Sequence, residues 1–140
     1  MTHGVNPTPA AQDPILVAAC DRALESLRTQ CRSLQVAAFA TDDGFEVTRR
    51  PASAEQDQRL ASMASSLQAL TEAVAHDRTL GESQYTLLEA ERGRVLLRRV
   101  PGQKLMLLAV FGTEEQSGLA ISISRGVLAQ LGDELALARR

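Results

Sequence analysis

The chain has 140 residues, a mass of 15.1 kDa and a formal net charge of −2 at neutral pH. This length fits one domain, which can bury roughly 68–70% of the surface its unfolded chain exposes and needs no disulfide or metal to fold. A pI of about 5.7 excludes a general DNA-binding surface. With one Tyr and no Trp, stacking on single-stranded nucleic acid is also not expected.

Residues 1–12 are interpreted as a polar tail, and residues 13–140 as a single domain. The tail contains Pro7 and Pro9 and lacks the basic start and apolar core of a signal peptide. No apolar run approaches the roughly 20 residues that a membrane span needs. We therefore expect a protein of the cytoplasm.

The two cysteines, Cys20 and Cys31, are eleven positions apart. On one helix they would lie about 16 Å apart along the axis, whereas a disulfide needs Cα atoms within about 7 Å. Buried free thiols are expected. With two His and two separated Cys there is no zinc spacing, and we expect neither a metal nor a cofactor.

The first half of the chain is predicted to form a helix and two strands. Asp13 is a good N-cap and Pro14 suits the first helical position, so a helix is expected to about residue 32. Residues 34–40 are nearly all apolar, which indicates a strand buried on both faces. A turn at residues 42–44 then leads into an alternating strand at 45–48.

A long helix follows, opened by a capping box of Ser53 and Gln56 and ended with the help of Gly81. One face is a clean apolar stripe, rich in leucine: Leu60, Met63, Leu67, Leu70 and Val74. The neighbouring face is a small-residue stripe: Ala61, Ala64, Gln68, Thr71 and Ala75. Because Glu72 is the only charge between Leu60 and His76, the helix is predicted to be covered on more than one side.

Three strands are predicted next, at residues 85–90, 94–100 and 104–111. The last is apolar throughout residues 105–111 and is expected to lie at the centre of the sheet, beside residues 34–40. The strands at 85–90 and 94–100 are separated by a turn at Arg92-Gly93. The strand at 85–90 is expected at the sheet edge.

A final helix is predicted from about Glu114, because Thr113 to Gln116 is similar to a capping box. Residues 119–124 alternate like a strand, so strand and helix both stay open there. Gly118, Gly126 and Gly132 would each weaken a helix by about 1 kcal/mol relative to Ala. The predicted fold class is α+β, with a five-stranded antiparallel sheet, helices on its faces and the order αββαβββα.

These elements, in this order, resemble the roadblock family of dynein light-chain-like proteins. The resemblance is carried by residues 36–47, 60–70, 93–100 and 105–110 and by the pair Gly118-Leu119. It implies a profilin-like sheet and a homodimer, or a heterodimer with a paralogue, built through the second helix and the third strand. It also implies a non-enzymatic adaptor. Bacterial members, such as mutual-gliding B proteins, work with small Ras-like GTPases in motility, polarity or signalling.

A physical argument also favours a dimer, because an unpaired sheet edge promotes aggregation and pairing two edges removes it. Small side chains would let two long helices approach closely. The contact is therefore expected to combine the small-residue stripe with Tyr85, Leu87 and Glu89 of the edge strand. The alternative is that the small residues are only compatible with a helix surface.

Basic side chains are concentrated on the fourth strand and its flanks: Arg92, Arg94, Arg98, Arg99 and Lys104. Alternation places Arg94 and Arg98 on one face and Arg99 on the other. Arg94 and Arg98, together with Arg49 and Arg50, are candidates for docking an acidic partner. The alternative is a solvated strand whose charges protect it against edge pairing.

No catalytic residues are predicted. His76-Asp77 falls at a helix end, where a cation is favourable without any chemistry, and no nucleophile follows a recognisable motif. The chain lacks a P-loop, so it is not itself such a GTPase. The second hypothesis is a small-molecule sensor that holds its ligand between sheet and helix, which would require a cavity there.

Overall fold

The computed structural model describes residues 10–52 and 58–139. The elements, in chain order, are η1 (Ala10–Gln12), α1 (Pro14–Gln30), β1 (Leu34–Thr41), β2 (Glu46–Arg50), α2 (Gln58–Asp77), β3 (Thr86–Ala90), β4 (Gly93–Arg99), β5 (Leu105–Phe111) and α3 (Ser117–Ala138). The predicted α+β class and the order of helices and strands are confirmed. The capping box of Ser53 and Gln56 lies outside the described residues.

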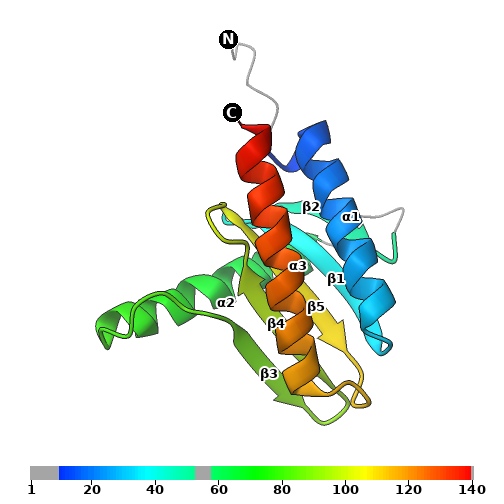
Figure 1. Cartoon of the computed structure of the whole chain (residues 1–140). Helices are drawn as coiled ribbons and strands as arrows, with labels where there is room; N and C mark the ends of the chain where they lie inside the picture. Colours follow the sequence, from blue (N-terminus) through cyan, green and yellow to red (C-terminus); the bar gives the residue numbers. More distant parts are fainter. Residues whose placement is uncertain (1–9, 53–57, 140) are drawn as a thin grey trace.

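The five strands form one antiparallel sheet in the order β2-β1-β5-β4-β3. The two fully apolar strands, β1 and β5, are neighbours at its centre, as predicted, with Ala37 opposite Ala109. Helices α1 and α3 run side by side over one face, and α2 lies on the other face, with its C-terminal end extending beyond the sheet (Figure 1). The molecule therefore has three layers, and β3 forms one edge of the middle layer.

The main core lies between the sheet and the pair α1 and α3. Leu24 and Leu27 of α1, Phe39 of β1, Leu107 of β5 and Leu128 of α3 are all buried there. These large side chains fill the centre of this core, which disfavours a sensor that would hold a ligand there. Both Cys20 and Cys31 are buried free thiols, as expected.

The start of α1 follows its sequence signals closely. The Asp13 carboxylate accepts a hydrogen bond from the Ile15 amide at 3.0 Å, and Pro14 is the first helical residue. Just before it, Ala10–Gln12, assigned to the tail by sequence, form a 3-10 turn, and Ala11 packs against the main core.

The predicted start of α3 was wrong by three residues. The helix begins at Ser117, and its N-cap, Gln116, makes no side-chain capping bond. Glu115, which lies between the two ends of the expected capping box, accepts hydrogen bonds from the amide and hydroxyl of Ser33, at 3.1 and 3.0 Å. Residues 119–124, which alternate like a strand, are helical. In the described residues, no helix is long and apolar enough to cross a membrane.

Two glycines of α3 provide a matched test of this packing. A Cβ at Gly132 would lie 2.8 Å from the carbonyl oxygen of Pro101, whereas a Cβ at Gly126 would meet no atom of the described residues within 4 Å. We predict that Gly126→Ala raises the free energy of unfolding by about 0.5–1 kcal/mol through helix propensity. Gly132→Ala should lower it by about 1–3 kcal/mol through the clash. Urea unfolding measures both, and the same sign for the two variants would contradict this packing.

Candidate interaction surface

The small-residue stripe of α2 packs against the chain's own sheet. Ala61 and Ala64 are buried in a second, smaller core with Ala40, Met106 and Leu108. The remaining members of the stripe also turn inward: Gln68 and Ala75 are buried and Thr71 is half-buried. Most of the stripe is therefore turned toward the chain's own sheet, and its role in a contact between subunits stays a prediction.

The polar members of this stripe have partners within the chain. The Gln68 amide donates to the Glu72 carboxylate at 2.8 Å, and the Thr71 hydroxyl donates to the Leu67 carbonyl at 2.9 Å. A hydroxyl–hydroxyl contact of 3.4 Å between Thr71 and Thr86 places the middle of α2 beside the start of β3. These bonds explain how Gln and Thr are tolerated on the sheet side of the helix.

Most of the leucine-rich stripe faces outward. Met63, Leu70 and Val74 are 56%, 65% and 62% exposed, while Leu60 and Leu67 are half-buried against the smaller core. The two stripes are one residue apart, which is about 100° around the helix axis, so which of them faces the sheet depends on how the helix is rotated about its axis. Small side chains on the sheet side let the helix approach closely, and the larger side chains are left outside.

The predicted edge strand is confirmed as an edge, since β3 pairs only with β4 among the described strands. Leu88 is exposed and lies opposite Val95, on the side of the sheet that carries α2. Leu87 points to the other side and packs against the main core. Glu89 is ion-paired with Arg94 at 2.8 Å. Tyr85, which was also predicted at the contact, precedes β3 and is exposed.

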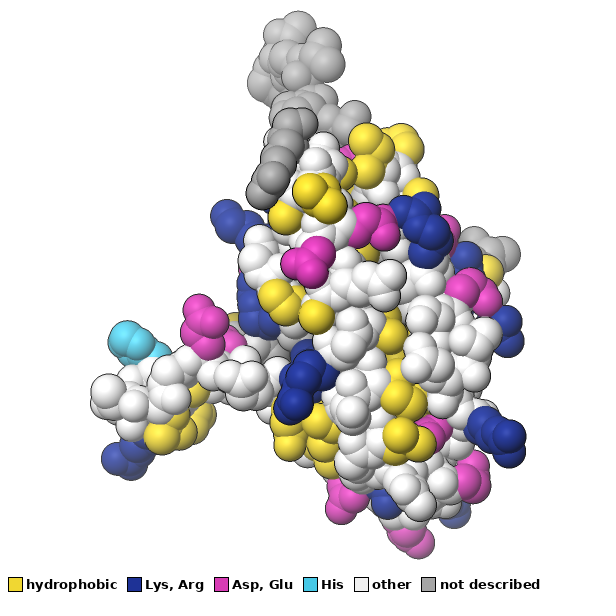
Figure 2. Space-filling model, in the orientation of Figure 1, with side chains coloured by type: hydrophobic (Ala, Val, Ile, Leu, Met, Phe, Trp, Pro, Cys, Tyr) yellow, Lys and Arg dark blue, Asp and Glu magenta, His cyan; other side chains and the backbone are white. Residues whose placement is uncertain are grey.

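Exposed apolar side chains are distributed differently on the side of the molecule opposite α2. Figure 2 shows the side covered by α1 and α3, where apolar side chains lie in small groups separated by polar and charged ones. Scattered exposed apolar residues of this kind are normal. On α2, by contrast, three large exposed side chains share one helix face beside an open sheet edge, which is the arrangement typical of an interaction site.

The arginines proposed as a docking patch are engaged inside the molecule. Arg94 donates to the carbonyl oxygen of Glu115 at 2.6 Å and to that of Thr113 at 3.3 Å. It thereby holds the segment that leads into α3. Arg98 is buried, with its guanidinium 5.3 Å from the centre of the Tyr85 ring. As predicted from strand alternation, Arg98 and Arg99 lie on opposite faces of the sheet.

The two arginines of β2 also have acidic neighbours. Arg49 lies 3.7 Å from the Glu46 carboxylate, and Arg50 lies 3.0 Å from Asp21 and 3.5 Å from Glu25 of α1. Docking of an acidic partner by Arg94, Arg98, Arg49 and Arg50 stays a prediction, and these internal contacts do not favour it.

The described part of the chain contains no group of three His, Cys, Asp or Glu side chains that could hold a metal ion. His76 is exposed at the end of α2, and the adjacent Asp77 lies 3.7 Å from Arg78. The features that stand out are therefore a helix face and a strand edge, both suited to contact with another protein.

No protein-family model and no curated protein matches this chain, but solved structures do. The Roadblock/LC7 domain from Streptomyces avermitilis is 14% identical with a TM-score of 0.76, covering 83% of this chain and 97% of that one. The gliding protein MglB from Thermus thermophilus is 20% identical with a TM-score of 0.73, covering 93% and 97%. A further MglB structure, in a tetrameric arrangement, is 20% identical with a TM-score of 0.73, covering 93% of this chain and 96% of that one. The chain has the roadblock fold.

The identities of 14–20% establish the fold, and the likeness extends along nearly the whole of each roadblock chain. The sequence resemblance to the roadblock family is thereby confirmed at the level of architecture. The orientation of α2 was not foreseen, although one signal pointed to it: the stripe beside the leucines is almost free of charge, as a helix face against a sheet must be.

Arg94 offers a test of whether the basic strand is structural. Its side chain is 24% exposed and makes three hydrogen bonds within the chain. We predict that Arg94→Gln lowers the free energy of unfolding by about 1–3 kcal/mol, whereas Arg92→Gln, at an exposed turn, changes it by less than about 0.5 kcal/mol. Urea unfolding compares the two, and equal effects would show that Arg94 is only a solvated surface charge.

Proposed function

We propose that the chain acts as a dimeric adaptor, with two copies joined through the leucine-rich stripe of α2 and the free edge of β3. The observation that carries this proposal is the outward orientation of Met63, Leu70 and Val74. Burying these side chains against a second copy would remove their apolar surface from water. Pairing two β3 edges would also satisfy the backbone groups that an open edge leaves without strand partners.

The packing of α2 supports a contact through the leucine-rich stripe over the contact through the small-residue stripe that the sequence predicts. The small-residue stripe already packs against the sheet within each chain, so we assign the helix–helix contact between copies to the leucine-rich stripe. Leu88 lies on the same side of the sheet and would extend the contact from α2 onto β3. A paralogue with the same two features could replace the second copy and give a heterodimer.

The adaptor would bind a small Ras-like GTPase, or another signalling protein, in the bacterial cytoplasm. Support comes from the family resemblance and from the fold shared with MglB, which is described as a gliding protein. Binding would rest on surface complementarity and not on a catalytic side chain. A role in motility, polarity or signalling follows from the same resemblance.

The dimer can be tested with two substitutions of the same kind at equal exposure. Leu70 on α2 is 65% exposed and Leu137 near the end of α3 is 63% exposed. We predict a solution mass twice the 15.1 kDa of one chain for the wild type. Leu137→Glu should keep that mass, whereas Leu70→Glu should give single chains, because it would bury a charge in the contact.

Light scattering on a gel-filtration column measures the mass, and circular dichroism confirms that both variants are folded. A wild-type protein of single-chain mass at micromolar concentration would contradict the dimer. An unchanged mass for a folded Leu70→Glu variant would show that the leucine-rich stripe is not the contact.

The adaptor role is tested by reconstitution with a small Ras-like GTPase encoded in the same genome. We expect a stable complex of defined stoichiometry with the GTPase loaded with GDP or with a non-hydrolysable GTP analogue. Size-exclusion chromatography with light scattering detects it, and lysozyme is the control for non-specific association. Absence of a complex in both nucleotide states would overturn the proposed partner while leaving the dimer intact.

A further inference from the structure

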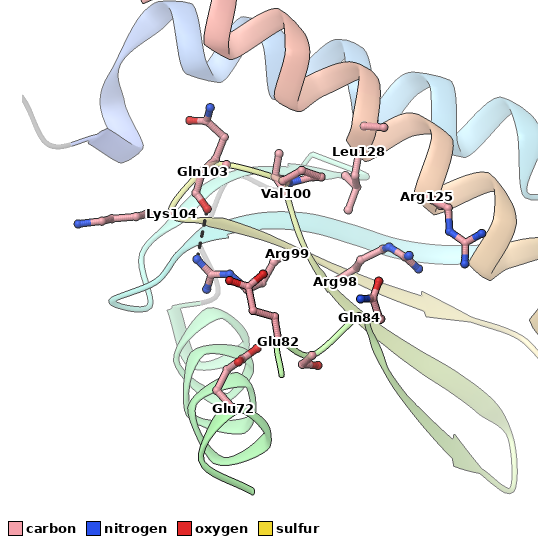
Figure 3. Close-up of a pocket in the computed structure, with 14 residues that line it drawn as sticks. Glu72, Glu82, Gln84, Arg98, Arg99, Val100, Gln103, Lys104, Arg125 and Leu128 are labelled. Atoms are coloured by element: carbon pink, nitrogen blue, oxygen red, sulfur yellow. Dashed lines mark hydrogen bonds between the residues drawn. The ribbon is translucent and has the colours of Figure 1, made fainter. Parts of the chain in front are cut away.

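A hollow of about 720 Å³ lies where β4, the turn between β4 and β5, and α3 meet Glu72 of α2 and the segment that precedes β3. Figure 3 shows Arg98 and Arg99 leaving β4 in different directions, with Arg125 reaching in from α3. The size lies within the range of small-molecule sites. The proposed dimer and GTPase partner do not account for this hollow.

Arg98 has an unusual environment for a cation. Its residue is 6% exposed, and its Nη1 atom is buried with no hydrogen-bond partner among the described residues. The Tyr85 ring lies under one side of the guanidinium at 5.3 Å, which gives a cation–π contact but no acceptor. A buried guanidinium nitrogen without an acceptor is costly, so a group that supplies one would be stabilised.

A second cation, Arg125, adds to the positive charge near Arg98. Arg98 and Arg125 point toward one another across the hollow (Figure 3), and within residues 10–52 and 58–139 neither forms an ion pair. Burial, and after it the positive charge of Arg125, lower the pKa of Arg98. This end of the hollow therefore has an excess of positive charge.

The carboxylates that line the hollow act on Arg99, at the end away from Arg98 and Arg125. Hydrogen bonding to Asp42 raises the pKa of Arg99, and the charges of Glu72 and Glu82 raise it further. Arg99 donates to both carboxylate oxygens of Asp42, at 2.8 and 3.0 Å. No carboxylate is among the groups that shift the pKa of Arg98. The hollow is thus divided into a compensated end at Arg99 and an uncompensated end at Arg98 and Arg125.

We propose that this hollow binds a small anionic molecule whose phosphate or carboxylate group sits between Arg98 and Arg125. Guanidinium groups donate in a planar fork that matches both oxyanions, and two of them converge on this point. The remaining volume holds the body of the molecule. Glu72 and Glu82 at the far end accept from hydroxyl or amine groups and disfavour a second negative charge there.

The test is the thermal unfolding of the full-length protein in sodium phosphate and, separately, in sodium acetate, with NaCl keeping the ionic strength constant. At least one anion should raise Tm saturably, by about 3 °C or more at ten times its half-saturating concentration. A response to phosphate alone identifies a phosphate site, and a response to acetate alone identifies a carboxylate site. No saturable response to either anion would overturn the proposal.

Variants separate binding at this point from a general salt effect. Arg125→Gln removes the more exposed partner and should abolish the saturable rise, whereas Arg92→Gln at the exposed turn between β3 and β4 should keep it. Arg98→Met should be at least as stable as the wild type without anion, because it removes an unpaired buried charge, and should show no anion response. A wild-type response in folded Arg125→Gln would contradict the assignment, whether or not Arg98→Met folds.

Discussion

Ala61 and Ala64 of α2 contact a sheet surface made by Ala40, Met106 and Leu108, and the surface that α2 presents to its surroundings depends on this contact. Two alanines let the helix lie close to the strands. Because a helix has one narrow face against a sheet, this choice decides the direction of every other side chain on α2. It turns Met63, Leu70 and Val74 away from the chain's own core.

The consequence is a molecule with two kinds of core. The first, between the sheet and the pair α1 and α3, is closed within one chain and contains large buried side chains such as Phe39 and Leu128. The second is small and is bordered by the half-buried Leu60 and Leu67. We interpret the second as one half of a core that a second copy would complete, with β3 at its open edge.

Much of the fold was predictable because the local signals agree with the tertiary structure. Residues 105–111 are apolar at every position, and β5 has the same bounds. Asp13 and Pro14 mark the start of α1 for reasons of hydrogen bonding and backbone geometry that apply without any tertiary contact. The start of α3 was missed because Glu115 bonds to Ser33, which is 82 positions away, and no local pattern reports such a contact.

The interaction surface was less predictable than the fold. Periodicity identifies both stripes of α2, but it does not say which one faces the chain's own sheet when a second protein can cover the other. Hydrophobicity alone would place the leucine-rich stripe against the sheet, whereas the small-residue stripe lies there. The burial of Arg98 was also hidden, because it depends on Arg125 and α3 passing over β4. A net charge of −2 conceals this local excess of positive charge.

The most direct test of the account is a distance between two copies of α2 in solution. A spin label at Ala73→Cys, exposed beside the leucine-rich stripe, reports it by dipolar spectroscopy. Burial raises the pKa of Cys20 to about 12 and that of Cys31 to about 11, so the two native thiols stay unreactive at neutral pH. We predict one well-defined distance between the labels, lost on adding Leu70→Glu. A wild-type background with no dipolar coupling would contradict the account.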